Sequence, residues 1–392
     1  MRILFHYRIR SKDGQFVHIE ELVSALRHLG HDVFLVGPAA VVTEKFGSDA
    51  RVIDWLKNLL PGFVYEALEF TYAFFAYMRL RKAVRRYRPD CLYERYSLFL
   101  PAGVWIKRRF GLPMLLEVNS PLLEERRKYS GLSLFRLAHW TQEQTWRGAD
   151  FVLPVTHVLA EYVRRASVPM SRIEVIPNGV NMERFEIASD RSESKRRLGL
   201  DGRLVLGFTG FLREWHGLES VVELLAKSDF GPLVHLLLVG DGPARQGLEK
   251  KALALGVADK LTITGIVERN AVASYLAAFD VALQPAVTDY ASPLKLFEYM
   301  AMGCAIVAPA KPNIMEILTA GKDAVLFDPG ESESFRQAVE KVCTDSSVRE
   351  RISKGAKNTI VERGLTWERN AQRVTDLFAR LGVQDKARNL GH

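Results

Sequence analysis

The chain has 392 residues, which is too long for one ordinary hydrophobic core and suits two domains of usual size. Its 48% hydrophobic and 26% charged residues are typical of a soluble globular protein, and its three scattered cysteines form no Cys-x-x-Cys pair that would favour a disulfide framework or a zinc site. The net charge of +8 lies in the first 177 residues, which hold 26 Lys and Arg against 18 Asp and Glu, whereas the remainder holds 28 of each.

Short apolar runs typical of β-strands alternate with helical segments through the whole chain. In the first half the predicted strands cover residues 3–5, 33–36, 91–93, 114–118 and 151–155. In the second half they cover residues 204–208, 234–239, 261–264, 281–284 and 305–307. Because strands and helices alternate, the pattern predicts right-handed βαβ units, and therefore two α/β domains with parallel sheets in series.

Residues 63–78 are rich in aromatic side chains and lead into a basic cluster. A helix at a membrane interface has this composition, but aromatic residues more often fill cores, so we expect this helix to pack on the first sheet. The basic clusters are expected to be solvated helix faces in preference to a membrane or acceptor surface. They cover residues 79–82, 85–88, 107–109 and 126–128. No nucleic-acid-binding signature is present, so nucleic acid is not an expected partner.

The turn residues Pro177, Asn178 and Gly179 mark the expected domain boundary. They separate a first domain of residues 1–176 from a second of residues 177–365. A last helix is predicted around residues 366–378 within the C-terminal segment 366–392.

A lysine and a glutamate stand three residues apart at the start of a predicted helix in residues 292–303 (SPLKLFEYMAMG). Because a strand precedes this helix, both are expected beyond a strand's carboxyl end, where open α/β sheets bind ligands. A helix N-terminus suits a diphosphate, and a carboxylate suits the hydroxyls of ribose. We therefore infer a nucleotide-sugar donor site; purely structural roles, such as a glutamate placed for the helix dipole, are the alternative. The residues assigned to this site are Ser292, Pro293, Leu294, Lys295 and Glu298.

This block resembles the donor-site signature of retaining GT-B glycosyltransferases of the family 4 type. Four more segments follow that family's order: 175–181 (VIPNGVN), 204–210 (LVLGFTG), 237–243 (LLVGDGP) and 261–265 (LTITG). The resemblance is dense over residues 175–330 and looser before them. It implies two Rossmann-like domains facing across a cleft, with the donor on the second, the acceptor on the first and the last helix returning to the first. It also implies retention of the anomeric configuration.

Two places depart from the family pattern. The second glutamate that relatives carry upstream of Glu298 is replaced by Tyr290, and the neighbouring Asp289 is a candidate for its contact with the donor sugar. In residues 208–217 (FTGFLREWHG), relatives have an arginine after Gly210 and a lysine before the last glycine, where this chain has phenylalanine and histidine. Arg213 or His216 is then expected to supply positive charge beside Lys295.

The first domain and the base-binding loop supply further candidates through the resemblance. Gly14 and Gln15 lie in a polar loop that relatives use near the donor phosphate, although a simple turn is the alternative. The nucleotide base is expected to be read by backbone groups around Gly265 and Val267.

Near the end of the strand at residues 114–118, Asn119 falls where many relatives place a histidine close to the sugar. Asparagine can donate and accept hydrogen bonds but cannot act as a base. Glu117 and Arg95 are candidates for contact with the donor sugar or the acceptor, with a structural anchor as the alternative for Glu117.

The predicted function is retaining, metal-independent transfer of a sugar from a UDP- or GDP-sugar to a hydroxyl of a glycan, glycolipid or small-molecule acceptor, in polysaccharide or glycoconjugate synthesis. No Asp-x-Asp motif occurs, so charge neutralisation is assigned to Lys, Arg and helix dipoles, and neither a metal nor another cofactor is expected. A sugar-nucleotide epimerase and a basic membrane-surface binding protein with a vestigial donor site are the alternatives.

The expected location is cytoplasmic, either free or peripheral on the inner face of the membrane. Met1 leads directly into a predicted strand without a signal peptide. The apolar stretch at residues 63–78 contains two glutamates and is shorter than the roughly 20 residues that span a bilayer. An anionic membrane surface is the candidate partner for the basic first domain.

Overall fold

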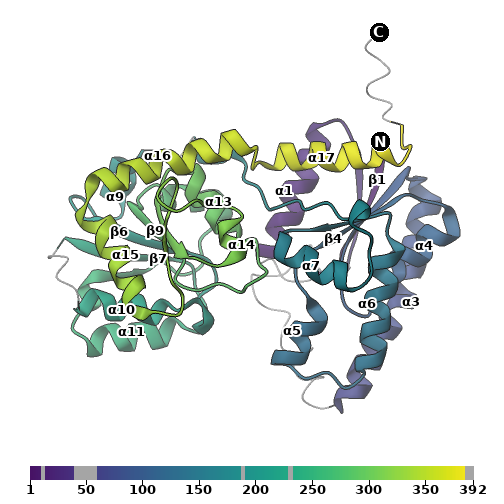
Figure 1. The fold of residues 1–392 in the computed structure, drawn as a ribbon, viewed down its shortest axis with the longest axis horizontal. Coiled ribbons are helices and arrows are strands. Elements are labelled where there is room, and N and C mark those ends of the chain that lie inside the picture. The colour runs from purple at the N-terminus through teal and green to yellow at the C-terminus, as the bar shows by residue number, and fades with distance from the viewer. Residues whose placement is uncertain (10–13, 39–59, 187–189, 228–232, 385–392) are drawn as a thin grey trace, which may run out of the picture. The chain divides into compact units, whose positions relative to one another are not determined.

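The computed structural model describes residues 1–9, 14–38, 60–186, 190–227 and 233–384 (Figure 1). The chain forms two compact units: Met1–Pro177, Tyr290–Ser292 and Trp367–His392 make the first, and Asn178–Asp289 and Pro293–Thr366 make the second. The first unit thus ends one residue after the expected boundary. Tyr290–Ser292 lie inside the expected second domain but belong to the first unit, a return of the chain that no sequence pattern marks.

The first unit is built on a parallel sheet in the order β2-β1-β3-β4-β5. Its strands are β1 (Arg2–His6), β2 (Asp32–Val36), β3 (Cys91–Arg95), β4 (Met114–Val118) and β5 (Phe151–Pro154). Strands β3, β4 and β5 are buried along their whole length, because helices cover the sheet. The order reverses between β1 and β3, and such a switch point leaves a crevice outside the carboxyl ends of the strands.

The helices of the first unit are α1 (Gly14–His28), α3 (Gly62–Tyr87), α4 (Ala102–Phe110), α5 (Leu122–Tyr129), α6 (Phe135–Gly148), α7 (His157–Arg165), the 3₁₀ turn η1 (Met170–Arg172) and α17 (Trp367–Arg380). The predicted last helix is α17, which packs along α1 (Figure 1). A hydrogen bond of 2.9 Å between His31 Nε2 and the Thr375 hydroxyl adds to that packing. The C-terminal helix is therefore an integral layer of the first unit.

The aromatic segment that was predicted to fill the core does so only in part. The buried residues of α3 include Ala73, Ala76, Leu80 and Ala83, which recur at helical spacing and form its inward stripe. Phe74 and Phe75 flank this stripe and are more than half exposed. The core prediction is therefore wrong for these two rings: small residues occupy the inward positions, and the helix periodicity turns the rings outward.

The second unit is built on a parallel sheet in the order β11-β10-β9-β6-β7-β8. Its strands are β6 (Leu204–Thr209), β7 (Val234–Val239), β8 (Leu261–Ile263), β9 (Val281–Leu283), β10 (Ala305–Pro309) and β11 (Val325–Phe327). The edge strand β11 was not predicted, since three residues are too few to show a periodicity. Two parallel sheets confirm the predicted α/β architecture, and here the switch point lies between β6 and β9.

The helices of the second unit alternate with its strands. They are α8 (Met182–Glu186), α9 (Arg191–Arg197), α10 (Leu218–Lys227), α11 (Arg245–Ala254), α12 (Arg269–Leu276), α13 (Leu294–Ala301), α14 (Pro312–Met315), α15 (Ser332–Thr344) and α16 (Ser346–Arg363), with the 3₁₀ turns η2 (Glu214–His216) and η3 (Ala258–Lys260). The side chains of Asp190 and Asp345 cap α9 and α16 by accepting backbone N–H groups.

Candidate functional site

The predicted donor residues of the second unit gather at the switch point of its sheet. Lys295 lies in the first turn of α13, which follows β9, and Gly210 directly follows β6. The two segments adjoin: a Cβ atom placed on Gly210 would lie 3.2 Å from Lys295 Nζ. Pro293 is the N-cap of α13, and Leu294 begins the helix, so the first backbone N–H groups of α13 belong to this corner.

The Lys295 ammonium rests on an aromatic ring. Its Nζ lies 3.7 Å from the centroid of Phe208, the penultimate residue of β6. Burial lowers the pKa of Lys295 from 10.5 to about 7, and Glu298, one turn further along α13, opposes this shift only in part. A positive charge is thus held where water solvates it poorly, and an anion arriving at this corner gains more from it than from a surface lysine.

Two glycines allow the loops at this corner to cross. Gly240, after β7, has φ +141°, and a Cβ atom on it would lie 2.1 Å from the Gly210 carbonyl oxygen. Gly210 itself has φ +129°. Side chains at these positions would force the loops apart, so both glycines are required by the close approach of backbone to backbone.

His216 is neutral near pH 7, contrary to the expectation that it supplies positive charge. Burial is the main cause that lowers its pKa to about 3, and the charges of Lys295 and Arg213 add to it. The His216 Nδ1 accepts the Arg213 backbone N–H at 3.3 Å, so the neutral ring carries its proton on Nε2. His216 can therefore donate a hydrogen bond. Of the two residues expected to supply positive charge beside Lys295, only Arg213 does so.

Arg213 is exposed, and its guanidinium lies 5.0 Å from the centre of the Phe211 ring. Phe211 stands where the family pattern that this segment resembles has an arginine. Its ring therefore supports a guanidinium from two residues further along the same loop.

The loop expected to read the base lies at the end of β8, two strands from β6 in the sheet. Gly265 has φ +76° and forms an isolated bridge with Gly240. The Gly240 N–H donates to the Thr264 hydroxyl at 3.1 Å, which ties this loop to the glycine crossing. Val267 is half-buried in the same loop.

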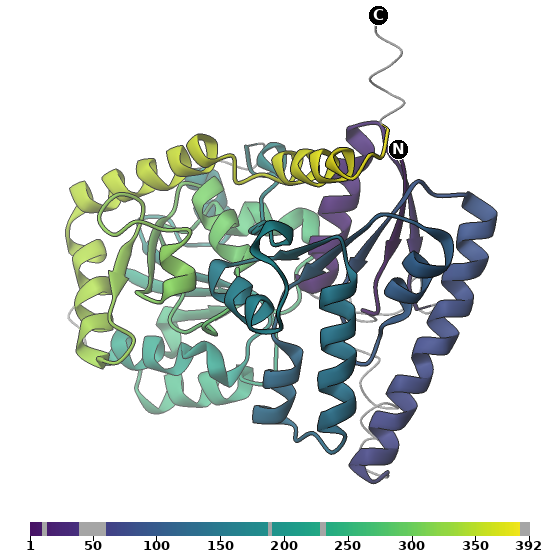
Figure 2. The same ribbon diagram turned by 45° about the vertical axis from the view of Figure 1, so that its right-hand side comes forward.

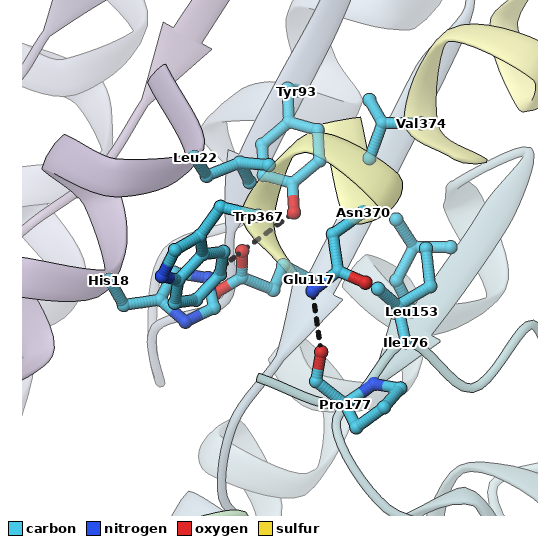
Figure 3. A pocket seen from close by; sticks show the side chains of 10 residues that line it. All are labelled: His18, Leu22, Tyr93, Glu117, Leu153, Ile176, Pro177, Trp367, Asn370 and Val374. Carbon is cyan, nitrogen blue, oxygen red and sulfur yellow. Dashed lines mark hydrogen bonds and ion pairs between the residues drawn. The ribbon is translucent and has the colours of Figure 1, made fainter. Parts of the chain in front are cut away.

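In the first unit, Glu117 at the end of β4 is the centre of a buried polar cluster (Figure 3). It accepts hydrogen bonds from the Tyr93 hydroxyl (2.6 Å), Arg95 Nη1 (2.6 Å), His18 Nε2 (2.8 Å) and the amide of Asn119. Burial raises the pKa of Glu117, but the charges of His18 and Arg95 and these hydrogen bonds outweigh it and hold the pKa far below its usual range. The carboxylate is thus ionised and fully engaged, which favours the structural anchor over a catalytic base.

The strand predicted at residues 91–93 extends further, and this changes the surroundings of Arg95, a candidate for contact with the donor sugar or the acceptor. Strand β3 continues to Arg95, which is 7% exposed and turned to Glu117. Because Tyr93 and Arg95 are two residues apart, they point to the same side of the strand. Asn119 is half-buried and remains a candidate for sugar contact through its carbonyl oxygen.

A small cavity borders the Glu117 cluster below α17 (Figure 3). His18 and Trp367 meet edge to face there, with ring centroids 4.8 Å apart. Asn370 donates to the Pro177 carbonyl at 2.7 Å on the opposite side. The C-terminal helix therefore contributes directly to the surroundings of Glu117.

Asp289 and Tyr290 are neighbours in sequence but belong to different units. The Asp289 carboxylate is largely exposed and pairs with Lys311 at 2.7 Å within the second unit. The Tyr290 hydroxyl donates to Glu125, and its carbonyl accepts from the Thr156 hydroxyl at 3.0 Å. Tyr290 is thus anchored in the first unit together with Ser292, which is buried.

Gly14 and Gln15 form the start of α1, which begins at Gly14 rather than near residue 18. The expected loop position is therefore wrong for both, because the helix extends further toward the N-terminus than its apolar periodicity indicated. Residues 11–13 of that loop lie outside the described residues.

Some residues that hold the elements around the candidate sites in place were not predicted from the sequence. The Tyr299 hydroxyl accepts the Thr209 N–H at 2.9 Å and so fixes α13 to the end of β6. His6 and Glu94 form a buried pair, 2.5 Å apart, across the switch point of the first sheet. A histidine and a glutamate at the ends of two apolar strands were visible in the sequence, but their pairing depended on strand order.

Within the described part of the chain, no group of three or more His, Cys, Asp or Glu side chains is placed to hold a metal ion. The metal independence inferred from the sequence stays a prediction.

Two family models together match most of the chain. Residues 12–184 match the model described as Glycosyltransferase Family 4, and residues 190–359 match the model described as Glycosyl transferases group 1. The alpha-D-kanosaminyltransferase of Streptomyces kanamyceticus is 25% identical over 289 residues, covering 71% of this chain and 73% of that protein. The lipopolysaccharide core biosynthesis glycosyltransferase LpsE of Rhizobium meliloti is 27% identical over 287 residues, covering 72% and 80%.

Solved structures share the fold over nearly the whole chain. Anabaena Alr3699/HepE, solved in complex with UDP-glucose, superposes with a TM-score of 0.74 at 18% identity, covering 97% of this chain and all of that one. The sucrose-phosphate synthase of Thermosynechococcus elongatus superposes with a TM-score of 0.74 at 17% identity, covering 97% and 99%.

Proposed function

This chain belongs to the group 1 glycosyltransferases and has the GT-B fold, and we propose that it transfers a sugar from a UDP-sugar to a hydroxyl acceptor with retention of configuration and without a metal ion. The observation that carries the proposal is the position of Lys295, in the first turn of α13 and at the switch point between β6 and β9. A diphosphate bound there meets a poorly solvated cation and free helix N–H groups together.

The leaving group sets the main catalytic demand. When the bond between the anomeric carbon and the diphosphate oxygen breaks, negative charge builds on that oxygen. Lys295, Arg213 and the N-terminus of α13 are the groups that oppose this charge, and the Nε2–H of neutral His216 adds a hydrogen bond. Because these groups are held in place before the reaction, they need little reorganisation as the charge develops.

We base retention on the resemblance to retaining GT-B glycosyltransferases, and the state of Glu117, in the first unit, bears on whether a covalent intermediate is formed. Glu117 accepts four hydrogen bonds and is not available as a nucleophile. We propose a front-side displacement: the bond from the anomeric carbon to the phosphate oxygen breaks, the acceptor oxygen bonds to the same face, and its proton passes to the leaving phosphate. Proton NMR of the product made from an α-linked donor tests this, since a β-linked product would contradict it.

The donor assignment rests on Lys295 and Glu298, with Glu298 proposed to accept the ribose hydroxyls. We propose UDP as the nucleotide of the donor because the Anabaena structure of this fold was solved with UDP-glucose. Calorimetry with UDP, GDP and ADP shows which nucleotide base the protein prefers, and repeating it with chelator shows whether binding needs a metal ion. The same titrations of Lys295→Ala and Glu298→Ala show whether these residues form the site. UDP binding that survives chelator and is lost in Lys295→Ala and Glu298→Ala is the expected result.

Lys251→Ala is a matched control for these variants. Lys251 also lies in the second unit, but it pairs with Glu219 and Glu223 on the surface. Binding that required magnesium or manganese would contradict metal independence. Conversion of the donor to an epimer without any acceptor would support the epimerase alternative.

A further inference from the structure

The outward side of α3 carries large apolar side chains that no described part of the chain covers. Phe63, Leu68, Phe74, Phe75 and Met78 are 56%, 52%, 55%, 67% and 55% exposed. The last four recur at spacings that place them on one side of a helix. At 1.5 Å per residue the five residues, from Phe63 to Met78, extend over about 22 Å of the helix axis. Soluble monomers rarely leave an apolar surface of this extent in water.

Tryptophans on α6 and α4 continue this surface, and Figure 2 shows α6 running beside α3. Trp140 of α6 is 45% exposed and meets Phe70 of α3 edge to face at 6.4 Å between centroids. Trp105 of α4 lies 5.3 Å from Phe74. Tryptophan combines an apolar body with an N–H group, and it is enriched where a protein meets the boundary between lipid and water.

The connection between α5 and α6 is fixed beside the start of α3. The buried Glu66 carboxylate accepts the backbone N–H groups of Ser133 (2.9 Å) and Leu134 (2.5 Å). Around this connection Tyr129 and Phe135 are exposed. A cation lies over each ring: Lys128 over Tyr129 and Arg127 over Phe135.

The outward side of α3 changes from apolar to basic along the helix. After Met78 its exposed positions are Arg79, Lys82, Arg85 and Arg86. These cations belong to the half of the chain that carries the whole excess of positive charge. Such a sequence of apolar and then cationic groups matches a surface that offers an apolar layer beside anionic headgroups.

We propose that this side of α3, with Trp140 and the connection between α5 and α6, binds the surface of an anionic membrane. We call these residues the α3 face. The apolar side chains enter the boundary between headgroups and acyl chains, and Lys82, Arg85 and Arg86 contact the phosphates. A second copy of the chain fits less well, because it brings the same positive charge to the contact. Among the described residues, no helix combines the length and the apolar character that spanning a bilayer requires.

Sedimentation with vesicles tests the proposal. The probes are vesicles of one part phosphatidylglycerol to two parts phosphatidylcholine, and vesicles of phosphatidylcholine alone. We expect the protein to bind the first kind in preference to the second, and the binding to weaken as salt is raised. Absence of binding to the anionic vesicles would overturn the proposal.

Two sets of variants locate the contact. Phe74→Ser with Phe75→Ser removes apolar side chains, and Lys82→Glu, Arg85→Glu and Arg86→Glu reverse charges. Each cation is worth about 1 kcal/mol at such a surface, so the partition coefficient should fall about fivefold or more for each charge reversed. Vesicle binding equal to that of the wild type in both sets would show that the contact lies elsewhere.

Matched controls change the same kinds of residue on the second unit. Leu253→Ser with Val361→Ser alters side chains that are 74% and 70% exposed. Lys250→Glu, Lys354→Glu and Lys357→Glu reverse three exposed charges. These controls should bind vesicles as the wild type does. If they lost as much vesicle binding as the α3 variants, the assignment of the contact to the α3 face would be overturned.

Two further readouts separate competing occupants of the α3 face. If the apolar variants lower the melting temperature by many degrees, the chain itself covers this face, for instance by residues 39–59, which lie outside the described residues; this would overturn the proposal. If the wild type is a dimer that the α3 variants dissociate, the face joins two copies, which would overturn it too. UDP binding measured on the same samples reports the donor site separately, so failure of one proposal is distinguishable from failure of the other.

Discussion

Lys295 Nζ lies 3.7 Å from the centre of the Phe208 ring, while Glu298 shares its helix. Burial lowers the pKa of the ammonium to about 7, because its effect exceeds that of Glu298, which raises the pKa. Holding a cation in this environment therefore costs folding free energy, and the proposed binding of a diphosphate offsets that cost.

Replacing Lys295 by methionine should abolish donor binding and stabilise the fold. The lysine pKa is lower in the folded state (about 7) than its reference value of 10.5, so between these values the unfolded state binds more protons and stability rises with pH. The charged lysine therefore opposes folding most at or below pH 7. Thermal unfolding should show a higher melting temperature for Lys295→Met at pH 7, with the difference vanishing toward pH 10.5. A lower melting temperature of the variant at pH 7 would contradict this account.

Donor affinity should depend on pH through the same group. In the proposed donor site the protonated lysine binds the diphosphate, so above a pKa of about 7 the free protein must take up a proton to bind. Between about pH 6 and pH 8 affinity for a UDP-sugar should fall about tenfold, since one proton is linked to binding. The ligand for this measurement should be a UDP-sugar and not UDP, because the diphosphate of a UDP-sugar does not titrate in this range. His216, whose pKa is about 3, should contribute nothing in this range. An affinity that does not change between pH 6 and pH 8 would contradict the role of Lys295.

A side chain at Gly240 should disrupt the donor site. A methyl group there would meet the Gly210 carbonyl oxygen at 2.1 Å, and the φ of +141° is unfavourable for alanine. Gly240→Ala should lower stability by about 1–3 kcal/mol or more and weaken UDP binding, because the loop carrying Gly210 must move.

Gly247→Ala is the control for this substitution. Gly247 lies within α11, where an added Cβ meets nothing within 4 Å. Alanine favours a helix over glycine by about 0.5–1 kcal/mol, so this variant should be slightly more stable and bind UDP unchanged. Equal losses in the two variants would argue against the crossing of the two loops as the cause. Urea unfolding and calorimetry measure both quantities.

Glu117→Gln should destabilise the first unit strongly. At pH 7 it leaves Arg95 buried beside a neutral amide, and breaking a buried pair costs about 3–5 kcal/mol. Because the folded pKa of Glu117 is lowered, its contribution is present above the unfolded pKa of about 4.3 and is lost as pH falls below it. The difference between variant and wild type in urea unfolding should therefore shrink in acid. Glu161→Gln, an exposed glutamate paired with Arg164, should change little.

Local pattern was enough to predict most of the strands and the helix that carries Lys295 and Glu298. The alternation of apolar runs with helical segments predicted ten of the strand positions, and the parallel sheets follow from it. The position of Lys295 and Glu298 in a helix that follows a strand was predictable because both elements are local and lie close together in the sequence; their role in donor binding stays a prediction. The short edge strand β11 carried too little periodicity to be seen.

Tertiary structure alone decided the protonation and the partners of the site residues. Burial beside Phe208 determines the pKa values of Lys295 and His216, and burial depends on residues from several strands. Glu117 became an anchor because strand order brings Arg95 and Tyr93 beside it. In α3 the sequence by itself determined a helix with aromatic and basic side chains, but which of them face water depended on which stripe the sheet and its neighbours cover. Composition and periodicity are local properties, whereas exposure and electrostatic environment are set by contacts between segments far apart in the chain.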